Sequence, residues 1–520
     1  MKLALARPRA TVSPLPALRM LAAVVGASTA GSALAFAGCS TSSGGGPVIT
    51  DDAGTDDTGG AVAFTYAPEG CAYTVTPPAS RGFVDLALDD ATPATSAAGD
   101  SAPLRVRLGL GGGTTRGAAG YADPSTSAVF TWETSARIHA SKVRLGASPA
   151  SLDVVHAGYA WTTPPPAIGF GANEPEAHMH EVHVCGLTAG TTYYYQVGGG
   201  APGAEVWSAT QSFTTVPRAQ QGKITLGVFG DARDQVTTWQ AVQTRMRDAA
   251  VSFSIVTGDV VDFGTQQSAF ATWLDAAWKD PADPAKFLTL GQQMLVTIAG
   301  NHEHDSSQFY GNFALPGDGE QAEQYASFDV GSAHVALVDD EPIAIQPSAP
   351  TSRAILAWLE ADLAGADAAR ADHPFLIVAA HRALFSTSKH AAESDVLAAR
   401  AALAPLIDRY HVDLVLNGHE HEYERSKPLR AAADPAGAPT VQPAGQGTVY
   451  VVNAGAGADP YASLADPGYR EKAAAYGGAT GYIGCYGLLT LEAAKLTLDA
   501  YMMKPGVGPD DLVDTVTLTR

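Results

Sequence analysis

The spacing of hydrophobic residues changes along the chain at about residue 217. Before it, short runs alternate apolar and polar positions and are separated by Gly, Pro and other turn residues. A period of two predicts half-buried β-strands, and many short strands between turns are typical of an immunoglobulin-like or fibronectin type III-like sandwich. The predicted strands span residues 127–134, 141–148, 180–187, 191–198 and 209–217. We therefore expect residues 61–217 to form an all-β domain.

After residue 217, continuous apolar runs of strand length alternate with segments of helical period. Helices are predicted at residues 236–250, 353–363 and 391–410, the last one interrupted or kinked near Pro405. Strands are predicted at residues 224–230, 251–258, 294–300, 333–338, 374–380 and 412–416, and again at 447–455, 486–492, 495–502 and 512–520. This alternation predicts an α/β sandwich of mixed sheets with flanking helices over residues 218–520.

Five of these apolar runs lead directly into residues with oxygen or imidazole donors. In an open α/β sheet, ligands collect outside the carboxyl ends of the strands. The residues at these positions are Asp231, Asp259, Asp262, Asn301, His302, His381, His419 and His421, the last two within the sequence NGHEHEYER. None of them is a cysteine, and such a donor set suits two divalent first-row cations better than a structural zinc site.

The motifs around these residues carry a family resemblance. The ordered set GDARD, GDVVDFG, GNHEHD, AHRALF and GHEHEYER resembles the calcineurin-like metallophosphoesterases, and within them the purple acid phosphatases and their bacterial relatives. The sequence HVCGLTAGTTYYYQVG, followed by WSATQSFTT, resembles the N-terminal β domain of the same subgroup. The resemblance implies a metallophosphoesterase that holds two divalent or trivalent metal ions, with Fe, Zn or Mn expected.

The resemblance also implies which residue binds which ion. Asp259 would bridge the two metals, Asp231 and His421 would complete one site, and Asn301, His381 and His419 would complete the other. Asp262 stands where purple acid phosphatases carry a tyrosine, which argues against their coloured Fe(III) site. We expect Asp262 either to ligate a metal itself or to support the site from outside the ligand set.

Three further residues are candidates for direct work on a phosphoester. Arg233 cannot ligate a metal, but its planar fork suits a phosphoryl group; the alternative is an ion pair with Asp234 or another neighbour. By resemblance, His302 donates a proton or contacts phosphate. His390 lies nine residues after His381 and resembles a phosphate-side histidine, the alternative being an exposed loop histidine.

The expected function is hydrolysis of a small phosphoester substrate by a metal-activated hydroxide. The motifs favour an acid-phosphatase-like phosphomonoesterase. A phosphodiesterase acting on nucleotides or lipid headgroups is the alternative of the same class. A surface protein that binds phosphate esters without turnover is the alternative from another class, because Asp262 and Arg233 both depart from family patterns. The β domain could also be an adhesive module that carries the enzyme.

The N-terminal residues predict export. Residues 1–38 combine Lys2, Arg7, Arg9 and Arg19 with an apolar stretch broken by small residues, as in a signal peptide. The stretch ends in FAGC, which resembles a bacterial lipobox, so Cys39 is expected to carry a lipid anchor to the cell envelope. Residues 39–60 are expected to form a flexible Gly/Ser-rich linker. The alternative is ordinary signal cleavage and secretion.

The charge bears on the binding partners of the chain, and the cysteine content bears on its disulfide bonds. The chain holds 32 basic and 53 acidic residues, a net charge of -21, which argues against binding a nucleic-acid duplex. Export permits a disulfide, and Cys71 and Cys185 can pair if both lie in the first domain, leaving Cys485 free. Three unpaired buried cysteines are the alternative.

Overall fold

The computed structural model describes residues 64–77, 81–89, 102–169, 171–219, 222–233, 235–280, 283–317, 323–506 and 508–520. All of them belong to one compact unit, Ala53–Arg520. The expected export signal 1–38, the linker 39–60 and the anchor residue Cys39 lie outside the described residues. Among the helices of the described ranges, none is both long and apolar enough to cross a membrane.

The N-terminal part is built from strands, as expected. Its elements are β1 (Val84–Leu88), β2 (Leu104–Gly109), β3 (Ala128–Thr134), β4 (Lys142–Gly146), β5 (Val154–Ala157), β6 (Tyr159–Thr163), β7 (Ala177–Val184), β8 (Thr192–Gly199), β9 (Val206–Trp207) and β10 (Gln211–Thr214). β1, β6, β7, β3 and β2 are neighbours in one sheet, and β10, β8, β4 and β5 form another. Phe130 of β3 packs edge-on to Tyr195 of β8, with ring centroids 4.7 Å apart, so the two sheets enclose a common core.

Cys71 and Cys185 form a disulfide, and Cys485 is free and buried. This confirms the pairing that the sequence left open. The bond joins the segment before β1 to the end of β7.

The C-terminal part contains two sheets with helices outside them. One sheet contains β11 (Ile224–Phe229), β12 (Phe253–Val256), β15 (Met294–Thr297), β25 (Gly484–Glu492), β26 (Lys495–Met503) and β27 (Asp511–Thr519). The other contains β16 (Tyr325–Val330), β17 (Ala333–Val338), β18 (Phe375–Ala380), β19 (Leu414–Asn417), β20 (Tyr423–Ser426), β23 (Val449–Asn453) and β24 (Arg470–Ala474). Both mix parallel and antiparallel pairs, as predicted.

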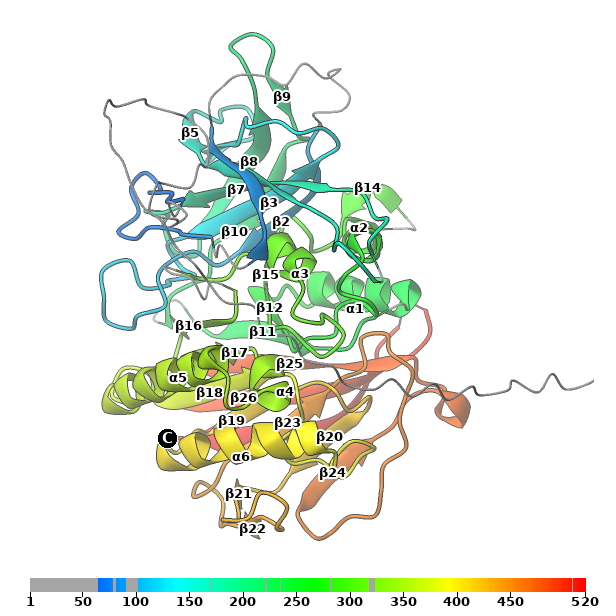
Figure 1. The fold of residues 1–520 in the computed structure, drawn as a ribbon. Coiled ribbons are helices and arrows are strands. Elements are labelled where there is room, and N and C mark those ends of the chain that lie inside the picture. Colours follow the sequence, from blue (N-terminus) through cyan, green and yellow to red (C-terminus); the bar gives the residue numbers. More distant parts are fainter. Residues whose placement is uncertain are drawn as a thin grey trace, which may run out of the picture. The chain divides into compact units, whose positions relative to one another are not determined.

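Helices cover the outer faces of these sheets. They are α1 (Val236–Asp248), α2 (Gln267–Ala276), α3 (Ser307–Asn312), α4 (Glu341–Ile345), α5 (Pro350–Ala368) and α6 (Ser394–Arg409). α5 and α6 lie side by side along the sheet that contains β18 and β19 (Figure 1). Two short hairpins complete the list: β13 (Lys279–Asp280) with β14 (Asp283–Phe287), and β21 (Leu429–Arg430) with β22 (Thr440–Val441).

The alternation of side chains along each strand explains this layering. On β18, Ile377 and Ala379 belong to the core between the two sheets, whereas Leu376 and Val378 pack against the helices. The side chains of β11 alternate in the same way: Val228 lies in the core between the two sheets, and Phe229 packs against α1. Because successive side chains of a strand point to opposite faces, each apolar run fills two cores at once.

The structure differs from the sequence expectation in two places. Helix α6 is not interrupted at Pro405: it continues to Arg409, and its residues Leu403 and Ile407 are packed into the sheet core, which offsets the lost backbone donor. In addition, β2 pairs with β15 through Leu108 and Met294, so one sheet of eleven strands runs from the N-terminal part into the C-terminal part.

Candidate metal centre

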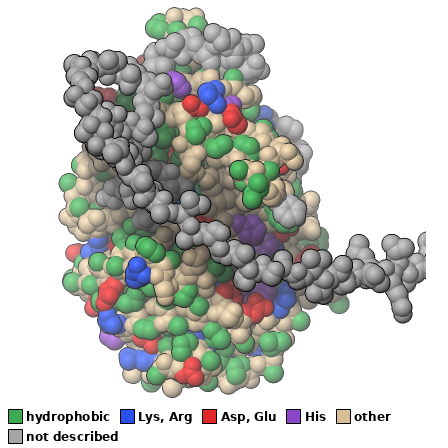
Figure 2. All heavy atoms as spheres, viewed as in Figure 1, with side chains coloured by type: hydrophobic (Ala, Val, Ile, Leu, Met, Phe, Trp, Pro, Cys, Tyr) green, Lys and Arg blue, Asp and Glu red, His purple; other side chains and the backbone are tan. Residues whose placement is uncertain are grey.

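The candidate ligands lie where strands of the two sheets end. Asp231 follows β11, Asp259 follows β12, Asn301 follows β15, His381 follows β18, and His419 follows β19. The side chains of Asp231, Asp259, His381, His419 and His421 are all buried. Histidine side chains gather in one area of the face drawn in Figure 2, with acidic side chains close by. The fold therefore brings all the predicted strand-end positions into one neighbourhood.

The backbone at three of these residues is strained. Asp231, Asp259 and His419 have φ values of 60°, 50° and 70°, in the left-handed region that side chains rarely adopt. Glycines beside them allow the close approach: a Cβ on Gly418 would lie 2.6 Å from Oδ2 of Asp231, and one on Gly300 would lie 2.3 Å from Oδ1 of Asp259. Strain of this kind costs on the order of 1–3 kcal/mol per residue and gathers at functional sites.

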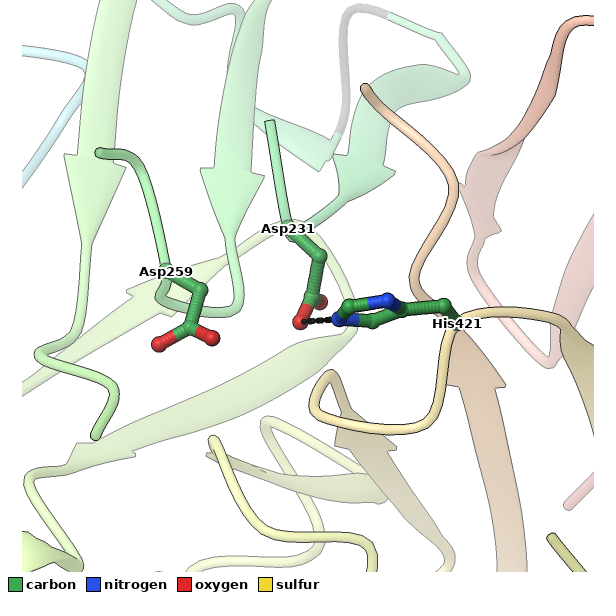
Figure 3. A group of neighbouring side chains, drawn as sticks. All are labelled: Asp231, Asp259 and His421. Atoms are coloured by element: carbon green, nitrogen blue, oxygen red, sulfur yellow. Dashed lines mark ion pairs between the residues drawn. The ribbon is translucent and has the colours of Figure 1, made fainter. Parts of the chain in front are cut away.

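Asp231, Asp259 and His421 form the first group of donors (Figure 3). One ligand atom from each lies within 4.8 Å of the other two. Nε2 of His421 is 3.5 Å from Oδ1 of Asp231, while its Nδ1 donates to the carbonyl of Asp459 at 2.6 Å. Because that hydrogen bond fixes the proton on Nδ1, Nε2 is the nitrogen that is free to ligate.

The second group of donors is centred on Asn301. Its Oδ1 lies 3.1 Å from Nε2 of His381 and 2.9 Å from Nδ1 of His419. Nδ1 of His381 donates to the carbonyl of Thr257 at 2.7 Å, so its Nε2 faces the group. Nε2 of His419 is buried and has no hydrogen-bond partner in the structure.

Asp259 links the two groups. Its Oδ1 is 3.3 Å from Nε2 of His381, and it also belongs to the cluster with Asp231 and His421. A carboxylate in this place can touch both ions of a two-metal site. Two buried carboxylates, an amide oxygen and imidazoles with free nitrogens thus fit two first-row cations.

Electrostatics favour the metal-binding form of two of these donors, Asp259 and His419, but not that of His381. Burial raises the pKa of the Asp259 carboxyl, but His381, His302 and Arg233 outweigh burial and hold its pKa below the ordinary value. Burial, together with His381, lowers the pKa of His419 well below its usual range. Burial also lowers the pKa of His381, yet Asp259 and Asp231 outweigh it and raise that pKa to about 9. His381 must therefore release a proton to bind a metal.

Arg233, Asp262 and His302 form a polar triangle beside the donors. The guanidinium of Arg233 pairs with Oδ1 of Asp262 at 3.0 Å, and Nδ1 of His302 lies 2.8 Å from the same guanidinium. The backbone N–H of His302 donates to Oδ1 of Asp259 at 3.0 Å. Asp234, the alternative partner of Arg233, lies outside the described residues. Direct ligation by Asp262 stays a prediction.

The side chain of Glu303 links the loop that carries Asp259 to the loop that carries Asn301. Its buried carboxylate accepts the backbone N–H groups of Asp259 at 2.9 Å, Val260 at 2.9 Å and Gly300 at 2.6 Å. Burial, with the charge of Asp259, raises the pKa of Glu303 to about 8.

Tyr461 is a residue of the centre that sequence reasoning missed. Its ring stacks on His421 at a centroid distance of 3.9 Å and meets His390 edge-on at 4.9 Å. Burial raises the pKa of its hydroxyl to about 12, and the nearby charge of Arg233 opposes this shift. The ring of His390 lies 4.6 Å from that of His419. Tyr461 follows no apolar run, so the strand-end pattern carried no signal for it.

Comparisons with known proteins match the two parts of the fold to known families. Residues 116–215 match the family model described as Purple acid Phosphatase, N-terminal domain, and residues 224–423 match the model described as Calcineurin-like phosphoesterase. Purple acid phosphatase PPD1 from yellow lupin seeds has a similar fold, with a TM-score of 0.62 and 18% identity over 81% of this chain and 75% of that chain.

Curated relatives show the same likeness. An uncharacterized protein of Mycobacterium tuberculosis is 27% identical over 59% of this chain and 61% of its own length. Acid phosphatase type 7 of Homo sapiens is 26% identical over 59% of this chain and 70% of that protein. Purple acid phosphatase 21 of Arabidopsis thaliana is 32% identical over 50% of this chain and 56% of that protein. The alignments thus span between about half and 70% of the relatives' lengths.

Proposed function

We propose, because the chain belongs to the calcineurin-like metallophosphoesterases of the purple acid phosphatase type, that it hydrolyses phosphoesters with two bound metal ions. Small phosphomonoesters are the proposed substrates, as in an acid phosphatase. Fe, Zn or Mn are the proposed metals. The observation that carries the proposal is the position of Asp259, which belongs to two adjacent groups of largely buried donors.

The residues of the first group would hold one ion and those of the second group the other, with Asp259 shared. When bound, two such ions supply a hydroxide nucleophile near neutral pH and neutralise charge on the phosphoryl group. Residues outside the ligand set hold the donors in place. The carbonyl of Asp459 orients His421, the carbonyl of Thr257 orients His381, and Glu303 binds the backbone of the loop that carries Asp259.

Other residues of the chain would act on the substrate directly. Arg233 presents a planar fork to a phosphoryl oxygen, and Asp262 holds that fork in place at 3.0 Å. His302 and His390 flank the donors, where an imidazole can pass a proton to the leaving oxygen. We propose Arg233, His302 and His390 as the residues that contact the substrate.

Metal analysis combined with turnover tests the proposal. Wild-type protein, purified without chelator, should contain about two metals per chain and release phosphate from a small monoester. Asp259→Asn should lose both metal and turnover, whereas Asp248→Asn, an exposed helix-end aspartate, should change neither. A wild-type protein that takes up metal and binds phosphate esters but hydrolyses none would favour the non-catalytic binding protein instead.

The substrate class is tested on the same protein. The ratio of kcat/KM on a monoester to that on a diester with the same leaving group should be well above one. A ratio below one would favour the phosphodiesterase alternative. Removing residues 61–217 tests the adhesive alternative, but the pairing of β2 with β15 predicts that this deletion also damages the catalytic sheet.

We also propose that the protein is exported and anchored through a lipid on Cys39. The proposal rests on the N-terminal sequence, and the disulfide between Cys71 and Cys185 suits an oxidising compartment. Metabolic labelling with an alkyne fatty acid should mark the wild type but not Cys39→Ser. Equal absence of label in both would leave ordinary secretion as the route.

A further inference from the structure

Glu420 is a buried carboxylate between two candidate metal ligands, His419 and His421, with a partner on another loop. Its side chain is fully buried, with 0% of its surface exposed. Oε1 accepts the backbone N–H of His390 at 2.8 Å, and Oε2 lies 3.3 Å from Nδ1 of the same residue. Glu420 therefore contacts both the backbone and the ring of one histidine.

A buried carboxylate is costly unless its charge is compensated. The ion pair that the structure shows for Glu420 is with His390, whose side chain is only 12% exposed. Nδ1 of His390 lies within ion-pair distance of this carboxylate, although neither Nδ1 nor Oε2 of Glu420 makes a hydrogen bond in the structure. This contact leaves Nε2 as the ring nitrogen for other partners. The ring itself stands beside the centre, 4.6 Å from the ring of His419.

The neighbouring glutamate Glu424 holds the start of the same loop in a different way. It accepts the hydroxyl of Ser386 at 2.7 Å and the hydroxyl of Thr387 at 2.8 Å, as well as the backbone N–H of Thr387. These contacts fix the loop but do not touch the His390 ring. Glu424 is thus a natural comparison for a purely structural role.

We propose that Glu420 is a positioning residue for phosphoester hydrolysis, which orients the imidazole of His390 so that Nε2 serves the leaving-group oxygen. The inference rests on the proposed function and extends it to a residue with no assigned role. The proton passes from Nε2–H to the oxygen of the breaking P–O bond, and the alcohol departs neutral. The carboxylate of Glu420, within ion-pair distance of Nδ1, stabilises the proton that stays on Nδ1.

A double-mutant cycle separates positioning from simple stabilisation. Glu420→Gln should lower kcat on an alkyl ester such as glycerol phosphate by about 10–100-fold, with KM and metal content nearly unchanged. It should lower kcat much less on 4-nitrophenyl phosphate, whose leaving group needs little protonation. In a His390→Asn background, the same change should have no further effect. Glu424→Gln should instead reduce thermal stability and act additively with His390→Asn.

Several outcomes would overturn the inference. They are wild-type kcat in Glu420→Gln, an equal loss on both esters, or additive effects in the double variant. If Glu420→Gln does not fold, ¹⁵N-histidine NMR of the wild type decides: His390 must carry a proton on Nδ1, and an Nδ1 without a proton excludes the arrangement.

Failure of the proposed function gives a different result. Wild-type protein with two metals would then release phosphate from neither ester. The test of the inference would then be the affinity for orthophosphate, measured by calorimetry. Glu420→Gln should weaken this affinity in the wild-type background but should have no effect in the His390→Asn background. Equal phosphate affinities, or no phosphate binding by the wild type, would overturn it.

Discussion

The backbone N–H of His419 donates to both carboxylate oxygens of Asp231, at 3.0 and 3.2 Å, although 188 residues separate the two. Asp231 follows β11 of one sheet, and His419 follows β19 of the other. The hydrogen bond therefore ties the ends of the two sheets together at the donors. The candidate metal centre depends on this junction, because each sheet supplies part of each donor group.

Replacing His421 tests the division into two metal sites. His421→Ala removes one donor of the first group, whose other members are Asp231 and Asp259. We expect the metal content to fall by about one ion per chain, with a loss of turnover of at least about 100-fold. Elemental analysis after dialysis measures the first effect and phosphate release the second. His411→Asn, a change at a histidine on the turn after α6, should alter neither; two retained metals in His421→Ala would contradict the assignment.

Asp262→Asn distinguishes a ligand from a support of Arg233. Because the Asp262 carboxylate pairs with Arg233 at 3.0 Å, we expect the variant to keep both metals and to lose about 10–100-fold in kcat/KM. Arg233→Lys should behave in the same way, since lysine cannot present a planar fork. Loss of one metal in Asp262→Asn, but not in Arg233→Lys, would instead identify Asp262 as a ligand.

His334 should make stability depend on pH far from the metal centre. It is fully buried between Asp329 and Asp362, at 2.9 and 2.8 Å. Burial lowers its pKa, but the hydrogen bonds and charges of the two aspartates outweigh burial and raise it to about 9. The native state thus holds this proton more tightly than the unfolded chain. The protonated His334 contributes fully to the free energy of unfolding below pH ~6.5. This contribution, about 3 kcal/mol, is lost as the pH rises through about 9.

Urea unfolding at several pH values measures this effect. The free energy of unfolding of the wild type should fall between pH ~6.5 and ~9. His334→Gln should be less stable at the lower pH and should show a flatter dependence over the same range. The control His411→Asn should keep the wild-type slope. A wild-type slope in His334→Gln would show that other groups carry the pH dependence.

The disulfide between Cys71 and Cys185 should stabilise the N-terminal β part. It closes a segment with a sequence separation of 114 residues, and removing such a bond typically costs about 2–4 kcal/mol. The double variant Cys71→Ser and Cys185→Ser should therefore melt at a lower temperature, and a reductant should have no further effect on it. Equal melting of the oxidised wild type and the double variant would contradict the prediction.

The strand-end pattern located most of the centre because it depends on local features. An apolar run predicts a strand, and the residue that follows must lie at an edge of a sheet, which gave Asp231, Asp259, Asn301, His381 and His419. Tyr461 escaped this reasoning, since it lies on a loop and reaches His421 only through tertiary packing. The sequence could not identify the ion-pair partner of Arg233 for the same reason, and the structure shows that this partner is Asp262.

The sequence by itself determined which layers form and which chemical groups the centre contains. Period-two alternation along each strand is a local property, and so are the residue types at the strand ends. The tertiary structure decided which donors lie together, that Asp259 belongs to both groups of donors, and that Glu420 faces His390. These contacts depend on the register between strands and on how two sheets meet, and residues far apart in the chain fix both of these.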